Sequence, residues 1–136
     1  MFTLGRRSRM RLEGVHPDLV RVVERAIGLT SVDFTVLEGL RDRERQARLV
    51  AAGASRTMRS RHLTGHAVDL GAWADGTVAW DWPLYHKIAE AMKQAAEDLG
   101  IALEWGGDWE SFQDGPHFQL ARAFYPDEWG SEVREA

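Results

Sequence analysis

Two histidines and an aspartate, His62, His66 and Asp69, lie close together in the stretch S-R-H-L-T-G-H-A-V-D-L, residues 60–70. Histidine nitrogens and carboxylate oxygens bind zinc, and a catalytic zinc site keeps its fourth position for water. The chain contains no cysteine, so a transition-metal site must be built from His, Asp and Glu. This stretch is therefore a candidate metal site that needs one further ligand from elsewhere in the chain.

The choice between the two histidines depends on the local backbone. His62 and His66 have the i, i+4 spacing of an H-E-x-x-H zinc helix, but Leu63 replaces the glutamate and Gly65 disfavours a helix. His62 and Asp69 form the stronger pair, one on a loop and one in the strand that follows. Gly65, with a small residue at position 67, would let the backbone pass close to an ion.

The third ligand has four candidates, namely His16, His66, His86 and His117. His16 opens one expected helix and His86 belongs to another, so both are read as surface or packing residues. His117 lies in D-G-P-H-F-Q, residues 114–119, three residues after Asp114. A water bound to a metal needs a base that is not itself a ligand, and Asp114 could be that base. Spacing alone leaves open whether His62, Asp69 and His117 form a site or are ordinary turn residues.

Ser60, His62 and Asp69 also have the residue types of a hydrolytic triad. All three lie within ten residues, on a loop and a strand, and no G-x-S-x-G motif surrounds the serine. The sequence therefore disfavours a serine hydrolase.

Composition and charge limit the class of protein. With 136 residues, 44% of them hydrophobic and 28% charged, the chain suits one soluble globular domain, residues 1–136. The net charge of −4 gives no general attraction to nucleic acid, although Arg6, Arg7, Arg9 and Arg11 crowd the N-terminus. We read this cluster as a solvated basic tail, and contact with a phosphate-bearing surface is the alternative. Neither a secretory signal nor a membrane span is expected, so the protein is predicted to be made in the cytoplasm.

The elements that must position the candidate residues can be predicted from apolar periodicity and from turn residues. The order of helices and short strands, with a hairpin signal at Asp75-Gly76, indicates an α+β fold with an antiparallel sheet. The expected helices are 17–28, 41–52 and 83–99, the expected strands are 33–40, 67–73, 101–105 and 117–121, and 53–66 is an expected loop.

The motif S-x-H-x-x-G-x-A-x-D, residues 60–69, resembles the signature of the zinc peptidases that cut peptidoglycan stem peptides. That family includes D-alanyl-D-alanine carboxypeptidases and phage L-alanyl-D-glutamate endolysins. Three more segments, G-L-R-D-R-E-R-Q (39–46), E-W-G-G-D-W (104–109) and D-G-P-H-F-Q (114–119), are similar to the endolysin branch and occur in the same order. The resemblance covers about residues 12–121.

The resemblance implies a role for each candidate residue. It makes His62, Asp69 and His117 the zinc ligands and Asp114 the catalytic carboxylate, in the place where many carboxypeptidases of the family have a glutamate. It also implies that Arg41 helps to hold the substrate or its developing oxyanion. Ser60 is then expected to be a hydrogen-bonding partner behind the ligands, and His66 a loop histidine near the metal but not bound to it. The implied fold is a small α+β domain with a central antiparallel sheet, flanking helices and zinc at the sheet edge.

The implied activity is zinc-dependent hydrolysis of the L-alanyl-D-glutamate bond in peptidoglycan for cell lysis, by a monomer that reaches the wall through a holin. The alternatives are a D,D-carboxypeptidase, a catalytically inactive binding module and a serine hydrolase. Three nearby aromatic residues, Trp105, Trp109 and Phe112, could form cleft walls. Core packing is the alternative for each of them, and it is favoured for Trp105. Of the other carboxylates, Asp108 is expected to serve a turn and Glu104 its strand.

Overall fold

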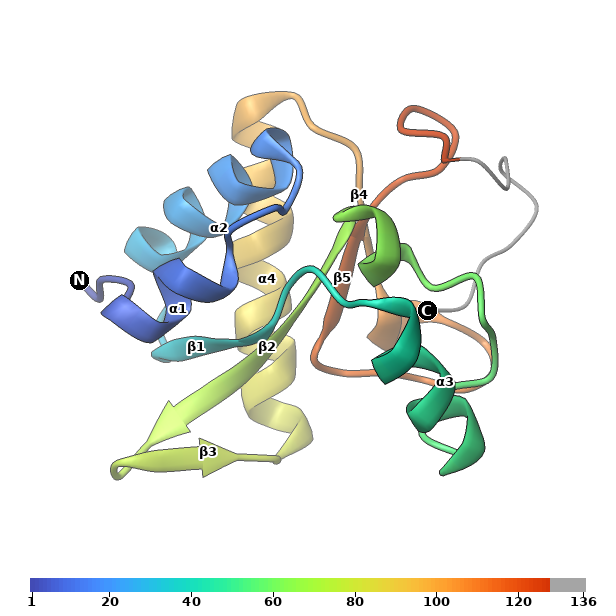
Figure 1. Cartoon of the computed structure of the whole chain (residues 1–136). Helices are drawn as coiled ribbons and strands as arrows, with labels where there is room; N and C mark the ends of the chain where they lie inside the picture. Colours follow the sequence, from blue (N-terminus) through green and yellow to red (C-terminus); the bar gives the residue numbers. More distant parts are fainter. Residues whose placement is uncertain (128–136) are drawn as a thin grey trace.

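The structure is a computed structural model that describes residues 1–127, so the last nine residues of the expected domain 1–136 lie outside the described part. Helices and short strands alternate around one antiparallel sheet, as predicted (Figure 1). In chain order the elements are α1 (Arg6–Arg11), α2 (Pro17–Leu29), β1 (Phe34–Glu38), α3 (Arg43–Ala51), η1 (Arg61–Thr64), β2 (Ala67–Ala74), β3 (Thr77–Ala79), α4 (Trp82–Leu99), β4 (Leu103–Trp105), η2 (Gly106–Asp108) and β5 (His117–Leu120), where η marks a 3-10 turn.

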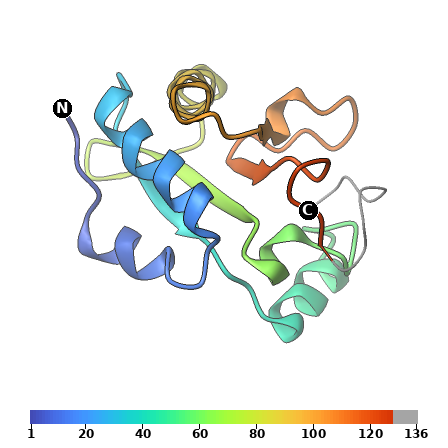
Figure 2. The same ribbon diagram turned by 90° about the horizontal axis from the view of Figure 1, so that it is seen from above.

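The two long helices provide about half of the buried hydrophobic residues of the core. Pro17 fits the first turn of α2, and the His16 ring accepts a hydrogen bond from the backbone N–H of Asp18, which caps that end. α4 ends at Gly100, whose left-handed backbone suits a glycine. The two helices pack against each other, and Figure 2 shows them side by side in the view from above. Within residues 1–127, no helix combines the length and the apolar composition that crossing a bilayer requires.

β2 is the strand that organises the sheet. It pairs with β1 along one edge and with β5 and β3 along the other, all antiparallel, and β4 pairs with β5. Alternate residues of β2, Val68, Leu70 and Ala72, are completely buried in the core. Asp69 and Trp73 therefore lie on the opposite face of the same strand. The chain passes from β2 to β3 through the predicted Asp75-Gly76 turn, whose residues both have positive φ.

The expectation of a basic N-terminal tail was wrong, because Arg6–Arg11 form α1 and this helix lies along the free edge of β1. The buried Ser8 hydroxyl accepts a hydrogen bond from Val36 N–H, and Arg11 Nη1 donates to the Val36 carbonyl at 2.9 Å. At this edge of the sheet, both backbone groups of Val36 are thus satisfied by side chains of α1. The six residues have no apolar stripe, so the sequence pattern could not reveal a helix held in place by tertiary hydrogen bonds.

Candidate active site

Three side chains from separate elements meet at one end of β2. Their ligand atoms lie within 4.8 Å of one another: His62 comes from η1, Asp69 from β2 and His117 from β5. His62 Nε2 and His117 Nδ1 are each 3.2 Å from Asp69 Oδ1. Asp69 and His117 are directly opposite each other in the β2–β5 register, so the strand pairing brings them together. The structure therefore assembles the three residues that the resemblance names as ligands.

In His62 and His117, the ring nitrogen that faces away from Asp69 is held by a hydrogen bond. His62 Nδ1 lies 2.8 Å from the Gly39 carbonyl, and His117 Nε2 lies 2.9 Å from Gln119 Oε1. Both of these oxygens are acceptors, so the far nitrogens carry the protons and the near nitrogens can present lone pairs to an ion. Gln119 is itself held, because its amide donates to Glu104 Oε1 at 3.3 Å from the opposite position on β4.

Electrostatics favours a charged Asp69 in this cluster. Burial raises the pKa of Asp69, but the charges and hydrogen bonds of His62 and His117 outweigh it and lower that pKa well below its ordinary value. Burial has the opposite effect on His117 and lowers its pKa, but the hydrogen bond and the charge of Asp69 outweigh burial and raise that pKa overall. The ionised carboxylate and the two imidazoles form a donor set of the kind that binds zinc in catalytic sites. The residues present therefore fit a zinc ion.

Asp114 faces the same pocket from the loop before β5. It lines a cavity of about 260 Å³ together with His62, Asp69, His117 and Arg41. Burial raises the pKa of Asp114, and the nearby charge of Asp69 raises it further. A raised pKa brings a carboxylate closer to the range in which it can accept and return a proton.

The loop that carries Asp114 is held close to the turn after β4. Asp114 N–H donates to the Gly106 carbonyl, and a side chain on Gly106 would lie 2.4 Å from the Asp114 carbonyl oxygen. Trp105 is buried in the core, and its indole N–H donates to the Gly115 carbonyl at 2.7 Å. Core packing of Trp105 was the favoured interpretation and is confirmed, and its indole N–H also holds the loop that carries Asp114.

Arg41 lies at the base of the pocket with its guanidinium already engaged. Its Nη1 donates to Gln46 Oε1 and its Nη2 to Glu38 Oε1, each at 2.7 Å, and Nη2 is 3.6 Å from Asp69 Oδ2. Burial raises the pKa of Glu38, but Arg41 and Arg45 outweigh this and lower it overall. Arg41 therefore acts on the site mainly through its buried positive charge beside Asp69, because both of its terminal nitrogens donate hydrogen bonds to other side chains.

Ser60 and His66 are near the site but do not touch the ion position. The Ser60 hydroxyl accepts a hydrogen bond from the backbone N–H of His62 at 3.1 Å and caps η1, so it positions the backbone of His62 and not its ring. His66 bonds to the Thr64 hydroxyl, and its ring packs against His16. Burial and the charge of Arg61 lower the pKa of His66 to about 4. His66 is thus a neutral histidine outside the cluster.

Gly65 is needed where two backbone segments come close together. Its φ of +75° ends η1, and a side chain there would lie 2.5 Å from the Gly14 carbonyl oxygen. Both the positive φ and the close approach favour a glycine at this position.

The other aromatic, histidine and acidic candidates differ in whether they line the pocket or pack beside it. Phe112 lines the cavity, whereas Trp109 packs its ring on that of His117 with 5.1 Å between centroids. His86, on α4, packs against Trp105. Asp108 was expected to serve its turn, but its carboxylate forms an exposed ion pair with Lys93 of α4.

Three residues that shape the site were missed from the sequence, namely Glu38, Gln46 and Gln119. Gln46 stands in the quoted segment 39–46, and Gln119 follows His117 by two residues, so both share a motif with a named candidate. The H-x-Q spacing on a strand places both side chains on one face and was the available signal for Gln119.

Comparison with known proteins gives independent evidence on this arrangement. A family model described as the phage L-alanyl-D-glutamate peptidase matches residues 1–125. The L-alanyl-D-glutamate peptidase of Escherichia phage T5 is 34% identical over 128 residues, which cover 91% of this chain and 93% of that protein. The L-alanyl-D-glutamate peptidase of Listeria phage A118 is 41% identical over 89 residues, covering 65% of this chain and 31% of that protein.

Two solved structures resemble the fold. The crystal structure of the Serratia marcescens L-Ala D-Glu endopeptidase ChiX matches with a TM-score of 0.88 and 52% identity, covering 93% of this chain and 95% of that one. The vancomycin-resistance D,D-dipeptidase VanXYg matches with a TM-score of 0.52 and 20% identity, covering 78% of this chain and 50% of that one, which supports a shared fold alone. Since the family model spans nearly the whole chain and the phage T5 relative is matched over most of its length, this chain belongs to the phage L-alanyl-D-glutamate peptidase family.

Proposed function

We propose that this protein is a zinc peptidase that hydrolyses the L-alanyl-D-glutamate bond of peptidoglycan stem peptides and so lyses cells. The observation that carries the proposal is the meeting of His62, Asp69 and His117 within 4.8 Å, in one pocket with Asp114. The names of the phage and Serratia relatives support the choice of scissile bond. Acting on the wall requires release from the cytoplasm, for which a holin is the expected route.

The zinc ligands in this proposal are His62 through Nε2, Asp69 through a carboxylate oxygen and His117 through Nδ1. Their orientation is maintained by the Gly39 carbonyl and by Gln119, each on the far side of a ring. Bound zinc would supply a water of lowered pKa and a positive charge next to the scissile carbonyl.

Asp114 moves the proton in the proposed reaction. Its carboxylate accepts a proton from the attacking water as the water oxygen bonds to the alanyl carbonyl carbon. It then gives that proton to the nitrogen of the D-glutamyl residue as the C–N bond breaks. The products are a free alanyl carboxylate and a free glutamyl amine. The raised pKa of Asp114, caused by burial and by Asp69, suits a group that must both take and return a proton.

Arg41 acts by charge in this scheme. Its guanidinium is buried next to Asp69 and is fixed by Glu38 and Gln46, so it cannot reorganise during the reaction. A fixed positive charge at the base of the pocket favours the negative charge that develops on the carbonyl oxygen. It also favours binding of an anionic substrate such as a glutamyl peptide.

Mass spectrometry of the muropeptides released from purified sacculi, with and without a chelator, tests the proposal. We expect new alanyl carboxyl ends and new glutamyl amino ends, abolished by the chelator and restored by zinc. Release of terminal D-alanine alone would identify a D,D-carboxypeptidase. Hydrolysis that is indifferent to the chelator would contradict a metal-dependent mechanism and favour a serine hydrolase. Binding without any product would indicate an inactive binding module.

A further inference from the structure

A cavity of about 610 Å³, larger than the site pocket, lies between α1 and the strands β1, β2 and β3. Its charged wall consists of Arg6, Arg7 and Arg11 from α1, and Trp73 of β2, which is 42% exposed, lines its floor. None of these residues belongs to the site described above. We call this cavity the α1 groove.

The α1 groove is positively charged in a protein whose net charge is −4. Within residues 1–127, Arg6 and Arg7 are exposed and take part in no ion pair. Arg11 donates a hydrogen bond from Nη1 to the Val36 carbonyl. The acidic residue in the lining, Asp33, accepts a hydrogen bond from the backbone N–H of Phe34. Three guanidinium groups against one carboxylate make the groove complementary to an anionic ligand.

An intermediate hollow of about 460 Å³ lies between the groove and the site. This hollow shares Arg11 and Leu37 with the α1 groove, and it shares Glu38 and Arg45 with the site pocket. The ribbon follows the same route, since β1 runs from beneath α1 toward the segment that enters α3 (Figure 1).

The alternation of side chains along β2 also places the site and the α1 groove on one face of the sheet. Asp69 at the site and Trp73 at the groove are four residues apart on one strand, so their side chains project from the same face of the sheet. A polymer bound along this face would contact the zinc ligands at one end and the arginines of α1 at the other.

We propose that the α1 groove binds a second stem peptide of the same peptidoglycan, through its carboxylates, while the first stem peptide is cut. This inference rests on the proposed function, because that function makes the substrate a polymer of repeating carboxylate-bearing peptides. Arg6 and Arg7 supply the cationic contacts, and Trp73 supplies an apolar surface. The groove thus increases affinity for the polymer by a second contact and takes no part in the chemistry.

The test compares a polymeric and a small substrate, using the zinc-loaded protein. In the double variant Arg6→Ala with Arg7→Ala, we expect the sacculus concentration at half-maximal rate to rise about threefold to tenfold, the effect of losing two exposed ion pairs. Turnover of a soluble muropeptide with a single stem peptide should stay within about twofold of the unmodified protein. The charge reversals Arg6→Glu with Arg7→Glu should have a larger effect on sacculi. Added salt should remove the difference, because it screens exposed charges.

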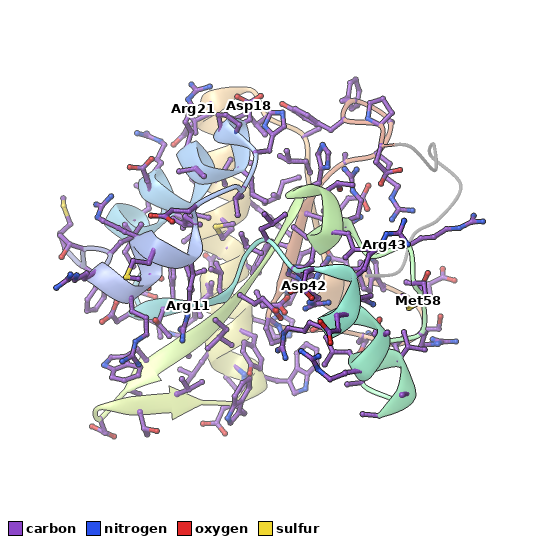
Figure 3. The ribbon with its side chains drawn as sticks, viewed as in Figure 1. Arg11, Asp18, Arg21, Asp42, Arg43 and Met58 are labelled. Atoms are coloured by element: carbon purple, nitrogen blue, oxygen red, sulfur yellow. The ribbon has the colours of Figure 1, made fainter. Side chains whose placement is uncertain are left out.

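The matched control is Arg21→Ala with Arg43→Ala, which removes the same charge from α2 and from the start of α3. Figure 3 shows these two side chains on parts of the molecule away from Arg11. The proposal is overturned if the α1 variants match this control on sacculi. It is also overturned if they lose equal activity on both substrates, which would place the effect in the fold or the site. A loss of binding to anionic phospholipid vesicles, with unchanged sacculus kinetics, would assign the groove to a membrane instead. If the unmodified protein cut neither substrate, the proposed function itself would fail.

Discussion

His62 and His66 are four residues apart, yet their rings have different surroundings. His62 faces Asp69, whereas His66 bonds to Thr64 and is neutral because its pKa is lowered to about 4. We expect His66→Ala to keep its zinc and most of its activity, and His62→Ala to lose both. Zinc stoichiometry by metal analysis and muropeptide release would measure this. Equal behaviour of the two variants would show that the ligands have been misassigned.

Asp114→Asn separates metal binding from chemistry. The amide keeps the size of the side chain but cannot accept a proton from water at neutral pH. Loss of general acid–base catalysis costs about 10²- to 10⁴-fold in rate, while zinc content and thermal stability should stay close to those of the unmodified protein. Asp108→Asn is the control, because that carboxylate is exposed and paired with Lys93. An active Asp114→Asn, or one that has lost its zinc, would contradict the assignment.

Gln119 is a positioning residue for His117. The Gln119 side chain is completely buried, and its Oε1 accepts a hydrogen bond from the Nε2–H of His117, which leaves Nδ1 free to bind the proposed zinc. Replacing Gln119 by Leu should weaken zinc affinity by about 10- to 100-fold, the range typical of a lost partner behind a metal-binding histidine. Competition with a chromophoric chelator would measure the affinity. Gln94→Leu, at the surface of α4, should leave it unchanged, and equal affinities in both variants would remove Gln119 from the site.

At the scale of the elements, a buried hydroxyl forms one of the two side-chain contacts described above between α1 and β1. Ser8 is 3% exposed and bonds both Val36 N–H and the Thr35 hydroxyl. Ser8→Ala should lower the free energy of unfolding by about 1–3 kcal/mol, because a buried N–H loses its acceptor. Urea denaturation would measure the loss. Ser31→Ala, at an exposed position, is the control, and an equally small change in both variants would show that this contact is not important.

Elements with a strong local pattern were predictable, and those fixed by tertiary contacts were not. The stripe of α2 and the Gly100 stop of α4 placed both helices to within one residue at each end. α3 is shorter than the expected helix 41–52, because Asp42 caps it and Arg41 turns into the pocket. β1 and β4 are shorter than the expected strands 33–40 and 101–105, since only the paired residues count as strand.

The same division holds within the site. His62, Asp69 and His117 could be named because the segments that carry them resemble the motifs of a known peptidase family, whereas their spacing alone left the site open. Glu38, the partner of Arg41, could not be recognised, because its importance depends on which guanidinium lies beside it. The H-x-Q spacing pointed to Gln119, but its support by Glu104 depends on which residue lies across the sheet. Strand register is a long-range property that composition does not encode.

At the scale of the whole molecule, zinc should couple the site to the stability of the fold. The proposed ligands come from η1, β2 and β5, and the unfolded chain does not hold them together. Metal that binds only the folded state stabilises it, by about 4 kcal/mol when free zinc is 1,000 times its dissociation constant. Calorimetry should therefore show a lower Tm after chelation and recovery with zinc. In His62→Ala the Tm should not respond to either treatment.

The increase in Tm that zinc causes should also vary with pH. Without metal, the raised pKa of His117 stabilises the folded chain below the pKa of the unfolded state, and this contribution is lost as pH rises through the folded-state pKa. Zinc must displace the same proton, so acid weakens its binding. The difference in Tm between zinc-loaded and chelated protein should shrink on acidification and grow with rising pH. A difference that is constant with pH would exclude His117 as a ligand.

The contact of α1 with β1 has one more consequence. β1 is an edge strand of the sheet, and a bare edge is a template on which the strand of another molecule can pair. Ser8 and Arg11 occupy the outward N–H and C=O of Val36. The helix therefore protects the sheet against intermolecular strand addition, and removing residues 1–11 would expose a hydrogen-bonding edge prone to aggregation.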